Sequence, residues 1–252
     1  MPASGPIAVV TGASAGIGAA TARALAAAGY RVLLGARRAD RIQELAQELR
    51  GDAFALDVTD EADIERFVKS VGDVAGRVDA LINNAGLALG LEPVGEGNDD
   101  DWARMLNTNV LGLLRVTRAF LPLLRRAPRA HIVNLGSVAG FEVYPGGAAY
   151  AASKHAVRAI TRTLRLELNG EPIRITEIAP GMVETEFSLV RFKGDAERAG
   201  AVYRGLQPLT GADIADCIVW AVTRPPHVNI DELVVRPLAQ ASASTVHRVA
   251  GG

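Results

Sequence analysis

Tyr150 and Lys154 stand four residues apart in a stretch that reads as helix, so both side chains project from one face. A free phenol, with a pKa of ~10, is a poor base at neutral pH. An ammonium about 4 Å away, at an effective dielectric of about 20, favours phenolate by roughly 4 kcal/mol, or about three pKa units. The pair therefore predicts a tyrosine that exchanges a proton with a carbinol or carbonyl oxygen. A tyrosine and a lysine four residues apart are a common combination, so an ordinary surface helix is the alternative.

A glycine-rich turn near the start of the chain predicts a phosphate site. Gly12, Gly16 and Gly18 follow a short β-branched run at 7–10 and precede an Ala-rich helical stretch. Such a turn lets the backbone approach a pyrophosphate, which then rests on the helix N-terminus. The spacing is T-G-x-x-x-G-x-G rather than G-x-G-x-x-G, although the strand–turn–helix context is the same. A purely structural turn is the alternative.

The end of the second predicted strand indicates which dinucleotide binds. NAD sites place a carboxylate about 20 residues beyond the glycine turn, on the ribose 2′-OH. Here Arg37 and Arg38 occupy that place, and no acid occurs before Asp40. Two guanidiniums attract a 2′-phosphate and offer nothing to a bare diol. The sequence therefore predicts NADP, against the alternative of a solvated arginine pair.

Short apolar runs alternate with helical patterns along the chain, which predicts right-handed βαβ units and a parallel sheet. The expected strands are 7–10, 31–36, 53–56, 80–82, 132–135, 173–178 and 233–235. The expected helices run from the glycine turn to 28, over 40–49, 60–74 and 99–126, from the Tyr150 segment to 168, and over 210–222. Residues 182–205 have a weak pattern, and the small, polar tail after Pro237 predicts disorder in its last residues.

Composition excludes several classes of protein. A net charge of −1 gives no sign of a nucleic-acid or membrane-surface partner. No stretch approaches the ~18 apolar residues of a membrane span, and the first residues lack the pattern of a signal peptide. A single cysteine, Cys217, suits a reducing compartment, so we expect a cytoplasmic protein. The histidines fit no metal-ligand spacing, and we expect no metal site.

Six motifs in one order span essentially the whole chain. They are T-G-x-x-x-G-x-G at 11–18, N-N-A-G at 83–86, Asn109, Ser137, Y-x-x-x-K at 150–154 and P-G at 180–181. Together they resemble the classical short-chain dehydrogenase/reductase family. The resemblance implies an α/β fold, a Rossmann-type doubly wound parallel sheet of about seven strands with helices on both faces. It also implies one NADP-binding domain over 1–252.

The resemblance also implies a role for each motif residue. Tyr150 would be the acid/base, and Lys154 would lower its pKa and hold the nicotinamide ribose. Ser137 would hydrogen-bond the substrate oxygen, unless it only shapes a turn, and Asn109 would hold a water in a proton relay to Lys154. Besides Tyr150 and Lys154, the implied NADP contacts are Gly12, Ser14, Gly16, Ile17, Gly18, Arg37, Arg38, Asp57, Val58, Asn84, Pro180, Gly181, Val183 and Thr185.

Four further segments, 87–90, 191–195, 227–230 and 246–248, resemble the NADP-dependent 3-hydroxy acid dehydrogenase group. That group oxidises serine, allo-threonine and short 3-hydroxy acids, and it is tetrameric. Segments 182–187 and 140–144, which should border the substrate, depart from its pattern. The resemblance implies a small 3-hydroxy acid or 3-hydroxy amino acid as substrate and a homotetramer as assembly.

A 3-hydroxy acid needs a cation for its carboxylate. Arg191 and Lys193 lie in the weakly patterned stretch that should cover the pocket as a lid, so we expect one of them to bind it. A solvated, mobile loop is the alternative reading of that stretch. For the whole chain, the alternatives are a reductase of a bulkier ketone or aldehyde and a non-catalytic dinucleotide-binding regulator.

Overall fold

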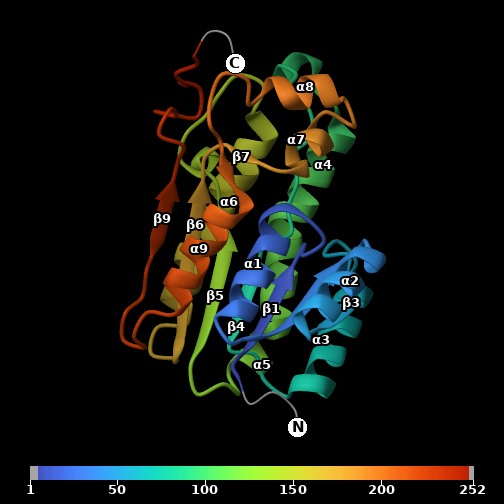
Figure 1. The fold of residues 1–252 in the computed structure, drawn as a ribbon, viewed down its shortest axis with the longest axis vertical. Coiled ribbons are helices and arrows are strands. Elements are labelled where there is room, and N and C mark those ends of the chain that lie inside the picture. Colours follow the sequence, from blue (N-terminus) through green and yellow to red (C-terminus); the bar gives the residue numbers. More distant parts are fainter. Residues whose placement is uncertain (1–4, 250–252) are drawn as a thin grey trace.

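The computed structural model describes residues 5–249, and its centre is a seven-stranded parallel sheet (Figure 1). The strands lie in the order β3 (Asp52–Ala55), β2 (Arg31–Ala36), β1 (Ile7–Thr11), β4 (Ala80–Asn83), β5 (Ala130–Leu135), β6 (Ile173–Pro180) and β9 (Glu232–Val235). The chain leaves β1 toward β3 and then returns to β4 on the other side of β1. Ligands bind outside the carboxyl ends of strands at such a reversal of order. The predicted sheet is confirmed, with strand ends shifted by at most two residues.

Alternate residues of β1 enter two different cores, which explains its uninterrupted apolar sequence. Ile7 and Val9 pack on the face covered by α3 (Glu61–Ala75), α5 (Leu113–Leu124) and α6 (Ala148–Glu167). Ala8 and Val10 pack on the other face, under α1 (Gly16–Ala27), α2 (Ala39–Leu49) and α9 (Gly211–Val222). Helices therefore cover both faces of the sheet, and the predicted doubly wound arrangement is confirmed.

The single helix predicted over 99–126 is interrupted. It consists of α4 (Asp99–Leu106), a π-helical turn η2 (Asn107–Gly112) and α5. A π turn holds one extra residue, which changes the direction of the side chains within it, and such turns are frequent at functional sites. Asn109 lies in this turn and is 2% exposed. A repeat of 3.6 residues does not reveal the extra residue, so the sequence pattern reads as one continuous helix.

The weakly patterned stretch after β6 contains short elements. The two-residue strands β7 (Val183–Glu184) and β8 (Leu209–Thr210) pair in parallel, and α7 (Glu186–Arg191) and α8 (Ala196–Ala201) lie between them. Figure 1 shows α7 and α8 beyond the end of the main sheet, near α4. Single turns η1 (Val94–Glu96) and η3 (Val138–Gly140) complete the elements. Helices of six residues are too short for apolar periodicity to reveal.

Across residues 5–249, no helix combines the length and the apolar character that crossing a bilayer requires. The disorder predicted for the last residues concerns 250–252, which lie outside this range.

Candidate active site

A cavity of about 570 Å³ opens at the carboxyl edge of the sheet. The turns after β1, β4, β5 and β6 form its floor, and α7 and the segment after β9 contribute walls. Among the residues predicted for the site, those that line the cavity are Gly12, Gly16, Ile17, Arg38, Asn84, Ser137, Tyr150, Lys154, Pro180, Gly181, Val183, Thr185 and Arg191. One cavity therefore unites residues from almost every motif in the sequence.

The glycine turn is held against the end of β4. The Asn84 amide donates to the carbonyl oxygens of Thr11 and Gly12, at 2.9 and 3.1 Å. The Thr11 hydroxyl in return accepts the backbone N–H groups of Asn84 and Ala85. A β-carbon at Gly18 would collide with the Gly12 carbonyl oxygen and with the Asn84 amide. Gly18 thus lies behind the turn, where close packing requires glycine, while Gly12 and Gly16 face the cavity.

Arg38 reaches across the glycine turn to the opposite wall. Its Nε donates to Ser14 Oγ at 3.1 Å, and its Nη1 lies 2.6 Å from a carboxylate oxygen of Glu186 in α7. Arg41 pairs with the other oxygen of Glu186 at 2.7 Å. Only Arg38 of these two arginines lines the cavity. The ion pair between Arg38 and Glu186 places the Arg38 guanidinium at the cavity rim and holds α7 beside it.

Tyr150 and Ser137 meet at the inner end of the cavity. Tyr150 lies in the first turn of α6, with its ring edge-on to Phe187 of α7 and the ring centroids 5.7 Å apart. Ser137 follows β5 and caps η3, where its Oγ accepts the N–H of Ala139 at 3.1 Å. The Ser137 hydroxyl, which donates to the Pro180 carbonyl oxygen at 3.5 Å, acts to lower the pKa of the Tyr150 phenol. These two hydroxyls can therefore face one substrate oxygen.

The expectation of a Tyr150 phenol with a strongly lowered pKa is wrong for this structure, and the effect of Lys154 on that pKa stays a prediction. Burial raises the pKa of Tyr150 to about 12, and Tyr144 adds to the rise, against smaller opposing effects of Ser137 and Arg191. The Lys154 ammonium instead donates to the carbonyl oxygen of Leu135 at 2.7 Å and lies 5.9 Å from the centroid of the Tyr150 ring. Removing the phenol from water disfavours phenolate, and this effect dominates here.

Lys154 itself has an altered acidity. The side chain is 7% exposed, and burial lowers its pKa to about 8, while the carboxylate of Glu177 acts in the opposite direction. The ammonium therefore begins to lose its proton little above neutral pH. The charge of Lys154 therefore depends on its burial and on the carboxylate of Glu177.

Asn109 uses its amide to fix the wall beside Tyr150. Its Oδ1 accepts the N–H of Leu87 at 2.9 Å, and its Nδ2 donates to the Leu87 carbonyl at 2.8 Å and to Ser153 Oγ at 3.0 Å. Ser153 Oγ in turn donates to the carbonyl oxygen of Tyr150 at 2.7 Å. Both amide hydrogens are thus engaged, and the relay through a water held by Asn109 stays a prediction.

The two candidate cations of the lid segment have different surroundings. The Arg191 guanidinium lies 5.4 Å from the centroid of the Tyr150 ring. It donates to the Tyr144 hydroxyl at 2.6 Å and to the Gly90 carbonyl oxygen at 3.1 Å. The Lys193 ammonium pairs with Asp101 at 2.7 Å, its side chain is 60% exposed, and it does not line the cavity. Only Arg191 is placed to contact a ligand beside Tyr150.

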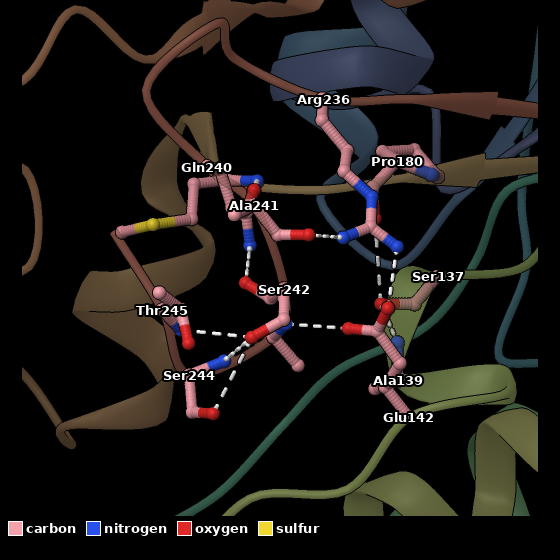
Figure 2. A network of polar contacts seen from close by, with 12 residues as sticks. Ser137, Ala139, Glu142, Pro180, Arg236, Gln240, Ala241, Ser242, Ser244 and Thr245 are labelled. Carbon is pink, nitrogen blue, oxygen red and sulfur yellow. Dashed lines mark hydrogen bonds and ion pairs between the residues drawn. The ribbon is translucent and has the colours of Figure 1, made fainter. Parts of the chain in front are cut away.

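The segment after β9 closes one side of the cavity. Figure 2 shows Glu142 accepting from Arg236. Glu142 also accepts the backbone N–H of Ala243, in the segment after β9. Gln240 Oε1 accepts the N–H of Met182 at 2.8 Å, next to Gly181. Gln240, Ala243 and Ser244 line the cavity. The end of the chain is thereby attached to two loops that carry predicted site residues.

Sequence reasoning missed several residues of this cavity and included others that lie outside it. Gln240 and Ser244 line it without belonging to any predicted segment, and Tyr144, Glu186 and Phe187 line it from segments expected to border the substrate, although no role was expected for them. The catalytic candidate Asn109, Lys193 and five predicted cofactor residues, Ser14, Gly18, Arg37, Asp57 and Val58, do not line it. Asp57 accepts hydrogen bonds from the N–H and the hydroxyl of Thr59. Contacts of these five with a cofactor stay predictions.

Comparisons with known proteins agree with this arrangement. The family model for short chain dehydrogenases matches residues 6–195. The sulfoacetaldehyde reductase 2 of Chromohalobacter salexigens is 45% identical, with 96% of this chain and 98% of the relative covered. The NADP-dependent 3-hydroxy acid dehydrogenase YdfG of Salmonella typhi is 44% identical, with 96% and 99% covered. The solved closed form of a serine dehydrogenase complexed with NADP⁺ is 42% identical, with a TM-score of 0.91 and 96% and 100% covered.

Proposed function

Because this chain belongs to the short-chain dehydrogenase family, we propose that it oxidises a small anionic 3-hydroxy acid, or reduces the matching carbonyl compound, with Tyr150 as the acid/base. The chain is an NADP-dependent oxidoreductase that acts on CH–OH groups. The substrate class is the proposal. The observation that carries it is the Arg191 guanidinium beside the Tyr150 ring.

The cofactor residues that we propose fit NADP in this structure. Gly12 and Gly16 leave the backbone of the first turn open to the cavity, and the Arg38 guanidinium lies at the same rim. Backbone N–H groups at a helix N-terminus suit a pyrophosphate, and a guanidinium suits a 2′-phosphate. When bound, NADP accepts or supplies the hydride. Gly181, Val183 and Thr185, which follow β6, also line the cavity, and Thr185 lies against Gly16 of the first turn.

Residues of the chain transfer the proton and bind the anionic group of the substrate. In reduction, the Tyr150 phenol donates its proton to the carbonyl oxygen, while the Ser137 hydroxyl holds that oxygen. In oxidation, the phenolate takes the proton of the substrate hydroxyl. Lys154 favours the phenolate by its positive charge. Arg191 binds the carboxylate and so fixes which end of the substrate faces Tyr150.

Two features support an anionic substrate. No carboxylate among the residues that the structure describes pairs with Arg191, so its charge is available to a ligand. The names of three relatives, a 3-hydroxy acid dehydrogenase, a serine dehydrogenase and a sulfoacetaldehyde reductase, all specify small compounds with an anionic group. A carboxylate or a sulfonate would each accept two hydrogen bonds from a guanidinium.

The Arg191→Ala variant tests the substrate class. A hydrogen bond to a charged group contributes about 1.5–3 kcal/mol, so we expect KM for 3-hydroxypropionate to rise roughly tenfold to a hundredfold. We expect KM for 1-propanol, which lacks the carboxylate, to stay unchanged. Initial rates of NADP⁺ reduction measure both constants.

Two further variants make the Arg191 test specific. Lys193→Ala removes a neighbouring cation that pairs with Asp101 outside the cavity, and we expect no change in either KM. Arg191→Lys keeps the positive charge and separates its effect from the contacts that attach α7 to Gly90 and Tyr144. An equal rise in both KM values for Arg191→Ala would show that Arg191 only shapes the lid.

The Arg38→Ala variant tests the proposed 2′-phosphate contact. We expect kcat/KM for NADP⁺ to fall roughly tenfold to a hundredfold, because one charge-assisted contact is lost, and kcat/KM for NAD⁺ to stay the same. Arg41→Ala is the matched control, since Arg41 also pairs with Glu186 but does not line the cavity. Parallel losses with both dinucleotides would refute a phosphate contact.

We also propose a homotetramer in the cytoplasm. The helical run from α4 to α5 exposes Leu106, Leu111 and Leu114, at 43%, 41% and 39%, and Leu166 near the end of α6 is 80% exposed. Apolar side chains at such positions favour contact between subunits. Sedimentation equilibrium that gives the mass of one chain would contradict this assembly.

A further inference from the structure

A buried carboxyl group lies behind the turn that carries Ser137. Glu177 of β6 is 1% exposed, and a β-carbon at Gly136 would collide with its Oε1. The same oxygen would lie 3.7 Å from a β-carbon at Gly140. Glu177 therefore packs directly under residues 136–140, on the side away from the cavity, and it does not line the cavity.

The Glu177 carboxyl group and the Lys154 ammonium contact adjacent residues of the same turn. The ammonium donates to the carbonyl oxygen of Leu135, and Glu177 Oε1 lies against the α-carbon of Gly136, the next residue. A β-carbon at Gly140 would be 3.0 Å from the backbone carbonyl oxygen of Lys154, so the turn also packs against the α6 backbone at that residue. The two charges attract through a buried region with little water, where such an attraction is strong.

The other charged groups facing Glu177 come from α6 and β9. Lys154, Arg158 and Arg162 lie at intervals of four residues on α6 and form one stripe. Glu232 of β9 is the register partner of Glu177, and it pairs with Arg158 at 2.9 Å and with Arg162 at 3.6 Å. The two arginines thus bind Glu232, while Glu177 Oε1 has no hydrogen-bond partner within the described chain.

An unpaired buried carboxyl oxygen destabilises a fold, and an apolar side chain would fill this space without that cost. A packing role alone therefore does not account for a glutamate here. We propose that Glu177 is a positioning residue: its carboxylate, buried behind the Ser137 turn, keeps Lys154 positively charged and so sets the pH range in which Tyr150 works. The inference rests on the proposed role of Lys154 in the reaction.

The acidities of the two groups agree with this assignment. Burial, reinforced by Glu232, raises the pKa of Glu177 to about 7, and Arg158, Lys154 and Arg162 oppose the rise. Burial lowers the pKa of Lys154 to about 8, and Glu177 opposes that fall. Between these values Glu177 is ionised and Lys154 is protonated, so each stabilises the charge of the other. Below pH 7, Glu177 becomes neutral and its support of Lys154 is lost.

The direct test is a titration of Lys154. The chain has three lysines, Lys69, Lys154 and Lys193, so protein labelled with ¹³C at lysine Cε gives few resonances, and Lys154→Arg assigns the one of interest. We expect Glu177→Gln, which removes the charge and keeps the shape, to lower the pKa of Lys154 by about one unit. Glu177→Met, of similar length, is a second charge-free variant. An unchanged titration of Lys154 in both variants would overturn the inference.

Glu232→Gln is the matched control. It removes a carboxylate of the same cluster and leaves two arginines to favour ionisation of Glu177. We expect it to maintain or raise the pKa of Lys154. A fall equal to that in Glu177→Gln would mean that any disturbance of the cluster has this effect, and would also overturn the inference.

A pH profile then connects Glu177 to catalysis. For oxidation of 3-hydroxypropionate with NADP⁺, we expect kcat/KM of Glu177→Gln to match the wild type near pH 6 and to fall several-fold below it by pH 8–9. A merely structural defect would give a constant ratio at every pH, and that result counts against the inference. A shifted titration of Lys154 with no change in the profile would instead contradict the role of Lys154 in the proposed function.

Discussion

Replacing Tyr150 with phenylalanine should reduce kcat/KM for hydroxy acid oxidation by roughly three orders of magnitude, because general acid–base groups contribute about 10²–10⁴-fold. The variant loses only the phenolic oxygen. Its ring keeps the edge-on contact with Phe187, 5.7 Å away between centroids, so the cavity should keep its shape. NADPH binding, measured by fluorescence titration, should remain. Steady-state rates of NADP⁺ reduction provide the measurement.

Tyr144 offers a matched control for Tyr150. Its hydroxyl also lies in the cavity, where it accepts from Arg191 at 2.6 Å. We expect Tyr144→Phe to raise KM for the hydroxy acid and to leave kcat nearly unchanged, since this phenol positions a binding residue. If Tyr144→Phe lost kcat and Tyr150→Phe kept it, our account would have assigned the proton transfer to the wrong tyrosine.

The acidity of Tyr150 also predicts a direction with pH. With its pKa raised to about 12, the phenol is protonated at neutral pH in the free protein and is ready to donate to a carbonyl oxygen. Oxidation needs the phenolate, so its rate should increase from neutral to alkaline pH until Lys154, with a pKa of about 8, loses its charge. Reduction should be favoured at lower pH.

Replacing Lys154 with methionine should have the second largest effect. The ammonium is buried and donates to the Leu135 carbonyl at 2.7 Å, close to the Tyr150 ring. Without it, phenolate formation in an apolar cavity has no compensating positive charge, and we expect kcat/KM for oxidation to fall roughly a hundredfold to a thousandfold. Methionine fills a similar volume, so the folded state should persist, as circular dichroism can verify.

Lys69→Met serves as the control for this variant. Lys69 lies on α3, is 77% exposed and pairs with Asp73, so its loss should leave the rates unaltered. Wild-type kcat/KM in Lys154→Met would show that the ammonium has no part in the reaction, and it would also remove the basis for a role of Glu177.

The sheet could be predicted because parallel strands buried on both faces have an uninterrupted apolar sequence. Arg31–Ala36 was predicted with the bounds that the structure has, since apolar residues fill both of its faces. The helix expected over 210–222 agrees within one residue with α9, which Thr210 caps. The glycine turn, Ser137 and the Tyr150–Lys154 pair meet in one cavity as expected. Their roles in binding and catalysis, and the single domain over 1–252, stay predictions.

Other features depend on contacts between residues far apart in the chain, which periodicity does not encode. The pairing of Arg38 with Glu186 joins residues from two distant turns, and Glu142 reaches the segment after β9. The π turn at Asn109 needs an extra residue that an amphipathic pattern does not reveal. The raised pKa of Tyr150 follows from burial in the assembled cavity, whereas the spacing to Lys154 alone suggested a lowered one.

Initial rates of NADP⁺ reduction by the wild-type protein test the central claim most directly. Serine, allo-threonine, 3-hydroxypropionate and 3-hydroxyisobutyrate would be compared as substrates, with NAD⁺ beside NADP⁺ and Tyr150→Phe beside the wild type. We predict turnover of these hydroxy acids with NADP⁺, weak turnover with NAD⁺ and a rate roughly a thousandfold lower in the variant. Clear NADPH binding without turnover of any of the four compounds would contradict the proposed substrate class.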